Sequence, residues 1–247
     1  MKIGIYGLGR FGAFWGDQLS KIGTVVGYSR NKDREVPKSI TKVSEEEVLS
    51  SDVIIICVAI SSMENFLISI KDKIKPGTLL MDTCSVKVYP VELMKKILPP
   101  WANIIGTHPM FGPDSGKLGV AGLPIVISEV RATKEQYNFW IEKFNQLNLS
   151  VIEMTPDEHD KEAAYTQGIT HFIGRTLADL HLKRSSISTT GYNSLLDIIK
   201  LTCNDEYQLF LDLQKYNSYT SLMRTDLKNS LNRILNIIES EGDISNG

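Results

Sequence analysis

Cysteine is scarce in this sequence of 247 residues, which holds only Cys57, Cys84 and Cys203, far apart along the chain. No C-x-x-C pair occurs, so neither a zinc ribbon nor a redox-active dithiol is expected. An odd and sparse set of cysteines also argues against the disulfide framework of a small secreted protein, and it suits a reducing compartment. Because no signal peptide precedes the first apolar residues, we expect a cytoplasmic protein.

Charge of one sign and long apolar runs are also missing. The 27 basic and 29 acidic side chains give a net charge of −2 without a basic stripe, which argues against a nucleic-acid partner. No apolar run approaches the roughly 18 residues that a membrane-spanning helix needs. The four histidines show no metal-ligand spacing with other residues, so no metal site is expected.

Short runs of consecutive apolar residues recur through the first two-thirds of the chain. Strands of this kind are buried on both faces, which is typical of parallel sheets covered by helices. The intervening segments are long enough for crossover helices. These features predict a doubly wound α/β domain over residues 1–154. Its predicted strands cover residues 3–6, 24–28, 53–58, 78–82, 103–106, 123–127 and 149–154, with a helix at 133–147.

The pattern changes at Thr155, where the sequence Thr-Pro-Asp-Glu has the hydroxyl, proline and acidic residue of a helix start. From there we expect a long helix to Lys183 and helical segments at about 192–203 and 205–239, which together form an all-helical domain over residues 155–247. A domain of this size has a small core. We therefore expect the apolar stripe of its last segment to form a homodimer interface, with packing inside the chain as the alternative. The stripe comprises Leu222, Leu227, Leu231, Ile234, Leu235 and Ile238.

A glycine-rich turn joins the first predicted strand to the helix after it. In the strand–turn–helix context that the G-x-G-x-x-G motif requires, its glycines allow a tight turn, close approach of a pyrophosphate, and close packing of helix on strand. The helix N-terminus attracts the negative charge. We therefore expect all six residues to bind a dinucleotide: Gly7, Leu8, Gly9, Arg10, Phe11 and Gly12.

The end of the second predicted strand indicates which dinucleotide binds. An NAD site commonly has an acidic residue there for the ribose 2′-hydroxyl, whereas this chain has Ser29 and Arg30. A hydroxyl and a guanidinium would bind the 2′-phosphate that a carboxylate would repel. We therefore expect NADP rather than NAD; the alternative is a solvated loop that binds no ligand.

Two reactive residues follow predicted strands, at the sheet edge where α/β proteins bind ligands. Ser85 comes just after the strand that ends near Asp82, and His108 comes just after the run 103–106. The prolines and glycine of residues 109–113 would hold His108 in a rigid loop. There its imidazole could accept a hydroxyl proton while hydride leaves the same carbon. A structural loop histidine is the alternative.

The other three histidines fall on the long predicted helix. His171 lies four residues after Gln167, so the two share a face, and we expect them to line a pocket. His159 and His181 are expected to be solvated or helix-capping residues.

Several stretches resemble the prephenate and arogenate dehydrogenases, the TyrA family. Residues 106–116 (GTHPMFGPDSG) resemble its H-P-M-F-G-P-x-S-G signature, and residues 82–87 (DTCSVK) resemble its D-x-x-S-V-K. Residues 158–160 (EHD) and 166–172 (TQGITHF) are similar to its E-H-D and Q-x-x-x-H-F motifs. The resemblance runs from Met1 to about residue 217.

The resemblance implies a Rossmann domain followed by a helical dimerisation domain. It implies an NADP-dependent oxidative decarboxylation of prephenate to 4-hydroxyphenylpyruvate, in tyrosine biosynthesis. His108 would act as base on the ring hydroxyl with Ser85 beside it, and Gln167 and His171 would bind the substrate. The alternatives are arogenate as substrate, another NADP-dependent reductase with this fold, and a dinucleotide sensor without turnover. A carboxylate near the substrate's side chain would favour arogenate, which carries an amino group there.

One position departs from the family's pattern. Family members commonly hold the ring carboxylate with an arginine five residues before an aspartate. Here Lys200 precedes Asp205 at that spacing. Lysine keeps the charge but loses the fork of two parallel hydrogen bonds. We expect Lys200 to bind the substrate, alone or with a second cation such as Arg175; the alternative is a solvated lysine.

Overall fold

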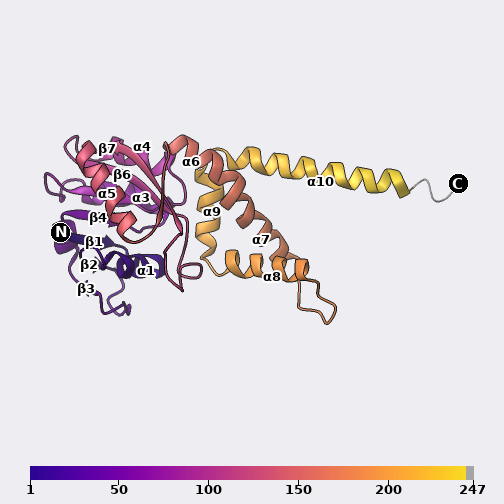
Figure 1. The fold of residues 1–247 in the computed structure, drawn as a ribbon. Coiled ribbons are helices and arrows are strands. Elements are labelled where there is room, and N and C mark those ends of the chain that lie inside the picture. Colours follow the sequence, from indigo (N-terminus) through magenta and orange to yellow (C-terminus); the bar gives the residue numbers. More distant parts are fainter. Residues whose placement is uncertain (243–247) are drawn as a thin grey trace. The chain divides into compact units, whose positions relative to one another are not determined.

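The computed structural model describes residues 1–242. The chain divides into two compact units, Met1–His159 and Asp160–Gly247 (Figure 1). The first unit is a sheet flanked by helices, and the described part of the second contains helices joined by loops, with no strand. The Rossmann-type α/β class and the helical C-terminal region predicted from the sequence are therefore confirmed.

The first unit is built on one eight-stranded sheet with the strand order β3-β2-β1-β4-β5-β6-β7-β8. All neighbouring strands are parallel except β6 and β7. The strand order reverses at β1 and β4, and this switch point is where α/β sheets bind dinucleotides. The strands are β1 (Lys2–Tyr6), β2 (Thr24–Tyr28), β3 (Ile40–Lys42), β4 (Val53–Ile56), β5 (Leu79–Asp82), β6 (Asn103–Pro109), β7 (Pro124–Arg131) and β8 (Ser150–Glu153).

Two features of the sheet differ from the prediction. The edge strand β3 was not expected, because its three residues form no apolar run. Strand β6 extends to Pro109, so His108 lies within a strand and not in a loop after it. Residues 107–109 stay in the sheet because β7 pairs with them antiparallel, with His108 opposite Val126.

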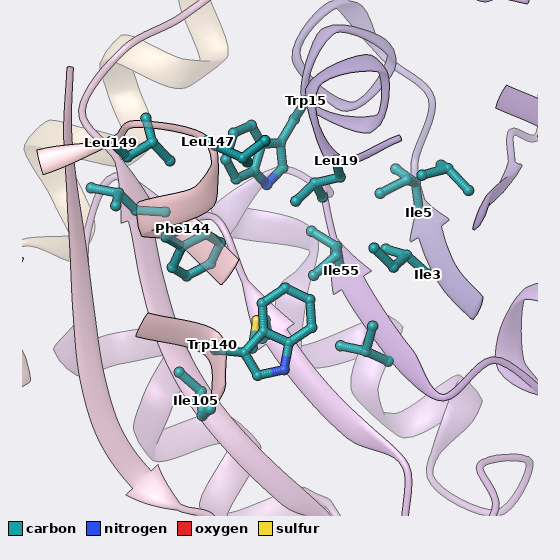
Figure 2. Packing of buried hydrophobic residues seen from close by; sticks show 14 of the residues in the cluster. Ile3, Ile5, Trp15, Leu19, Ile55, Ile105, Trp140, Phe144, Leu147 and Leu149 are labelled. Atoms are coloured by element: carbon teal, nitrogen blue, oxygen red, sulfur yellow. The ribbon is translucent and has the colours of Figure 1, made fainter. Parts of the chain in front are cut away.

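The main core lies between the sheet and the helices α1 (Arg10–Leu19) and α5 (Lys134–Gln146). Alternate residues of each strand point to this face. Helices α2 (Glu45–Leu49) and α4 (Val88–Ile97) pack on the opposite face, because a Cβ added at Gly4 would meet Val48 of α2 and one at Gly106 would meet Val91 of α4. A 3₁₀ turn (Ile60–Ser62) leads into α3 (Met63–Ile70), which packs beside α4. Figure 2 shows the main core with Ile3, Ile5, Trp15, Leu19, Ile55, Ile105, Trp140 and Phe144.

The long helix predicted from Thr155 is formed by three consecutive elements. These are α6 (Pro156–Ala163), a π-helical turn (Ala164–Gly168) and α7 (Ile169–Asp179), which ends before the predicted Lys183. Its start is a reciprocal cap, because Thr155 Oγ1 accepts from the Glu158 N–H at 3.2 Å and the Glu158 carboxylate accepts from the Thr155 N–H at 2.9 Å.

Three further helices follow: α8 (Thr190–Cys203), α9 (Tyr207–Tyr216) and α10 (Thr220–Gly242). Helices α7 and α8 cross closely, since a Cβ at Gly174 would lie 2.1 Å from Thr202 Oγ1. The predicted single segment 205–239 is wrong, because Asn217 separates α9 from α10. Its buried side chain donates to Asp160 O at 2.7 Å and accepts from the Tyr219 N–H at 2.9 Å. The second bond is local, and asparagine side chains that bond to the nearby backbone in this way compete with helix formation. None of the helices within residues 1–242 is long and apolar enough to cross a membrane.

Candidate active site

The glycine loop after β1 has the backbone shape that a dinucleotide requires. Gly7 adopts φ 104°, where other residues are strained, and its N–H donates to Tyr28 O at 3.0 Å. A Cβ at residue 12 would lie 2.0 Å from Gly7 O, so α1 packs on the turn only because Gly12 is there. A Cβ at Gly9 would meet no described atom within 4 Å, which leaves the backbone open beside the N-terminus of α1. The loop therefore fits a pyrophosphate.

The other residues of the loop differ in what their side chains contact. Leu8 is buried in the core, and Phe11 packs beside Trp15 with ring centroids 6.5 Å apart. Their contribution to a bound dinucleotide would therefore come from the backbone. Arg10 is exposed and forms an ion pair of 2.5 Å with Asp114, which lies in the loop after β6. This ion pair connects the glycine loop to the segment that follows His108.

Ser29 and Arg30 follow β2 at the same edge of the sheet. Ser29 Oγ accepts a hydrogen bond from the Asn31 N–H at 3.2 Å, which shapes the turn. Arg30 is exposed, but its charge reaches the end of β1. Burial raises the pKa of Tyr6, and the guanidinium of Arg30 opposes that rise. The Arg30 side chain thus lies near the carboxyl edge of the sheet, where the adenosine ribose of a dinucleotide would bind.

A fully buried ion pair of Asp82 and Lys87 lies at the carboxyl end of β5. Lys87 Nζ also donates to Thr107 O at 2.6 Å, and Asp82 Oδ1 accepts from the Thr107 N–H at 3.3 Å. The turn between the two charged residues is therefore attached at both ends to the residue before His108. Ser85 lies in that turn and is buried. The sequence patterns had assigned no role to the ion pair.

His108 is buried and contacts a second buried histidine. Its Nδ1 lies 2.8 Å from Nε2 of His159, in the first turn of α6. Burial, together with the ionisable ring of His159 and the charge of Lys87, holds the pKa of His108 well below the ordinary 6.5. His108 is therefore neutral near pH 7, as a general base must be. The expectation that His159 is solvated or capping is wrong, because its side chain is buried against His108.

A row of buried polar atoms runs along one face of the π turn and α7. Gln167 Oε1, His171 Nδ1 and Arg175 Nε are buried and have no hydrogen-bond partner among residues 1–242. The three residues are spaced four apart, which places them on one helix face. Leaving such an atom unsatisfied costs about 1–3 kcal/mol. Buried groups of this kind call for an explanation, and a ligand is the one that their alignment supports.

Two charged residues lie beside His171 in the second unit. Burial lowers the pKa of His171, the carboxylate of Asp205 opposes this, and the guanidinium of Arg175 adds to it. Arg175 is fixed, since its Nη2 donates to Asp205 O at 2.8 Å and its guanidinium lies 5.2 Å from the centre of the Tyr207 ring. Lys200 is exposed on α8. The charge of Asp205 is therefore felt at His171, on the helix that carries the buried polar row.

His181 is exposed just after α7, with a positive φ of 54°. Among residues 1–242, no group of three His, Cys, Asp or Glu side chains could hold a metal ion.

Two family models match the chain. The model described as "Prephenate dehydrogenase, nucleotide-binding domain" matches residues 17–122, which include Ser85 and His108. The model described as "TYRAAT1-like, C-terminal domain" matches residues 176–242, which include Lys200 and Asp205.

Two plant proteins and one solved structure are similar over most of the chain. Arogenate dehydrogenase 1, chloroplastic, of Arabidopsis thaliana is 38% identical over 88% of this chain and 36% of its own length. Arogenate dehydrogenase 2, chloroplastic, of the same plant is 34% identical over 88% of this chain and 64% of its own length. The chain thus spans less than two-thirds of the length of either relative. The crystal structure of prephenate dehydrogenase from A. aeolicus, in complex with hydroxyphenyl propionate and NAD+, superposes with a TM-score of 0.75 at 17% identity, covering 98% of this chain and 92% of that one.

Proposed function

We propose that this chain, as a member of the prephenate and arogenate dehydrogenase family, oxidises arogenate to tyrosine with release of carbon dioxide and reduction of NADP. Prephenate, the substrate that the sequence patterns favoured, becomes the second candidate. The names of the two Arabidopsis relatives support this order.

The observation that carries the choice of arogenate is the carboxylate of Asp205 beside His171. Arogenate has an amino group where prephenate has a keto group, and the amino group is cationic near pH 7. A carboxylate attracts an ammonium group and is repelled by the lone pairs of a keto oxygen. Asp205 would therefore strengthen the binding of arogenate and weaken the binding of prephenate.

The same face of the helical unit offers groups for the rest of the substrate. We propose that Gln167 and His171 bind it through the buried atoms that have no partner in the described chain. Arg175 supplies a fixed guanidinium for a substrate carboxylate, the role in which Lys200 was predicted. Lys200, exposed on α8, then adds a second positive charge instead of acting alone.

In the first unit, the glycine loop is proposed to bind the dinucleotide, and His108 is proposed to accept the proton of the ring hydroxyl. The nicotinamide supplies the acceptor for the hydride that leaves the ring carbon bearing the hydroxyl. Neutral His108 accepts the proton of that hydroxyl, and Ser85, in the turn attached to Thr107, is proposed to hydrogen-bond the same oxygen. Loss of carbon dioxide makes the ring aromatic, and His108 returns the proton to the ring oxygen, which is the phenol hydroxyl of tyrosine. The side chains therefore mainly orient the reactants and hold one proton.

NADP is proposed over NAD because Ser29 and Arg30 follow β2 where an NAD site commonly has an acidic residue. The effect of the Arg30 charge on the pKa of Tyr6, at the end of β1, supports this choice. A 2′-phosphate there would gain a charge-assisted hydrogen bond from the guanidinium.

We also propose that the chain forms a homodimer through α10. Every residue of this helix from Lys228 to Ser240 is exposed. Its exposed apolar residues recur at three- and four-residue steps, and a face of that kind usually packs against another chain. The cytoplasmic location predicted from the sequence stays a prediction; both Arabidopsis relatives are named as chloroplastic.

Substituting Asp205 by Asn tests the choice of substrate. The variant keeps the size of the side chain but loses its charge. We expect kcat/KM for arogenate to fall about 10- to 100-fold, as for other hydrogen bonds to charged groups, and kcat/KM for prephenate to stay level or rise. Glu206→Gln, which neutralises the neighbouring exposed carboxylate, is the matched control. Equal losses with both substrates would contradict the proposed role of Asp205.

A further inference from the structure

The contact between His108 and His159 determines where the protons of both rings lie. The two nitrogens are 2.8 Å apart, and the ring planes are inclined at 70°. At this distance one nitrogen must donate and the other must accept. If both carried a proton, the two N–H groups would point at each other. The pair therefore shares one proton at the contact, and the tautomers of the two rings are coupled: when one is set, so is the other.

The two histidines are held by different elements that meet at this point. His108 lies near the end of β6, where it pairs with Val126 of β7. Strand β7 pairs with β8, and Ser128 Oγ donates to Met154 O at 2.7 Å just beyond β8. The reciprocal cap of Thr155 and Glu158 then begins α6, which carries His159 one residue later. Both side chains are buried, so the contact is built into the unit.

The contact allows two arrangements with opposite chemical consequences. If His159 donates, the remaining proton of neutral His108 lies on Nε2, and that nitrogen cannot accept another. If His108 donates from Nδ1, its Nε2 is unprotonated and can act as a base. Nδ1 is occupied by the contact in either case, so Nε2 is the nitrogen left for a substrate.

We propose that His159 is a positioning residue whose Nε2 accepts the Nδ1 proton of His108 and so leaves Nε2 of His108 as the basic atom. The inference rests on the proposed function, in which His108 takes the proton of the ring hydroxyl. In this arrangement the ring proton of His159 lies on Nδ1 of His159, because Nε2 of His159 is the acceptor.

The arrangement also stabilises the state that follows proton transfer. When Nε2 of His108 gains the hydroxyl proton, the ring becomes a cation not far from the charge of Lys87. The Nδ1–H bond to the lone pair of His159 then becomes charge-assisted and offsets part of that repulsion. A base oriented by a third group in this way loses much of its effect when that group is removed, even if the geometry survives.

Two substitutions of His159 separate positioning from packing. Gln places an acceptor oxygen the same number of bonds from the backbone as Nε2, whereas Leu fills the space without an acceptor. We expect His159→Leu to lower kcat with the proposed substrate by on the order of 100-fold, with little change in KM or in the Kd for NADP, and His159→Gln to stay within about tenfold of the wild type. His181→Leu, at an exposed histidine, is the matched control. Equal losses in the Leu and Gln variants would overturn the inference.

A second measurement needs neither a variant at His159 nor turnover. The chain has only four histidines, so their ring nitrogens can be resolved by NMR after labelling histidine with ¹⁵N, and His108→Asn assigns the signals of His108. We expect His108 at neutral pH to carry its proton on Nδ1, with Nε2 unprotonated. A proton on Nε2 would overturn the inference even if the enzyme is active. If the wild type oxidises neither arogenate nor prephenate, the proposed function fails, and the NMR result still decides how the histidines pair.

Discussion

His108 is neutral because burial and two nearby positive or ionisable groups, His159 and Lys87, disfavour its charged form. The proposed chemistry depends on that neutrality. Replacing His108 by Asn keeps a polar side chain but removes the base, so kcat should fall by roughly 100-fold or more. The Kd for NADP should not change, which fluorescence of the reduced dinucleotide can measure, and His181→Asn is the control. Unchanged turnover would remove His108 from the mechanism.

Arg30 is the residue on which the choice of dinucleotide depends. Replacing it by Ala should raise KM and Kd for NADP by about tenfold or more, because a charge-assisted hydrogen bond to the 2′-phosphate is lost. The same constants for NAD should hardly move, since NAD has a hydroxyl there. Lys32→Ala, in the same turn, is the control. Equal weakening of both dinucleotides would show that Arg30 does not contact the phosphate.

Individual residues differed in how far the sequence could predict them. The glycine loop was predictable because its function lies in local backbone shape, which G-x-G-x-x-G in a strand–turn–helix context encodes. His159 and Asp205 were not, because each acquires its role from a partner about 30 or more residues away. The E-H-D resemblance was the one signal for His159, and it gave no partner.

Among the elements, sequence periodicity predicted most strands and helices but not where they end or are interrupted. Strand β6 is longer than its apolar run because pairing with β7 extends it through His108. The π turn within the long helix is invisible to a periodicity argument, yet it carries Gln167 at the start of the buried polar row. Turns of this type are frequent at functional sites. The break between α9 and α10 depends on the buried contacts of Asn217.

Helix α10 is the element whose exposed face predicts assembly. Ile234 and Leu235 are 56% and 54% exposed, so charging them costs little in the isolated chain. The double substitution Ile234→Glu and Leu235→Glu should convert a dimer into a monomer, since it places charges where apolar side chains would be buried. Light scattering after size-exclusion chromatography measures the mass, and Asn236→Glu on the same helix is the control. A wild type that is monomeric at micromolar concentration would contradict the proposed dimer.

At the scale of the whole molecule, the order of strands and helices is what the sequence predicted best. Consecutive apolar runs require a sheet covered on both faces, and the eight-stranded sheet with its reversal at β1 and β4 satisfies that requirement. This topology brings the glycine loop, the turn holding Ser85 and the end of β6 to the carboxyl side of neighbouring strands. The choice between arogenate and prephenate could not be predicted in this way, because the proposed choice rests on one carboxylate in the helical unit.

The central claim is that this chain oxidises arogenate with NADP, and the direct test is the absorbance of the reduced nicotinamide during turnover. Arogenate and prephenate should each be offered with NADP and with NAD to the purified wild-type protein. We expect the largest kcat/KM with arogenate and NADP, a smaller value with prephenate, and weaker use of NAD with either. A preference for prephenate would contradict the role of Asp205. No reduction with any of the four combinations, in a protein that binds NADP, would contradict the proposed activity itself.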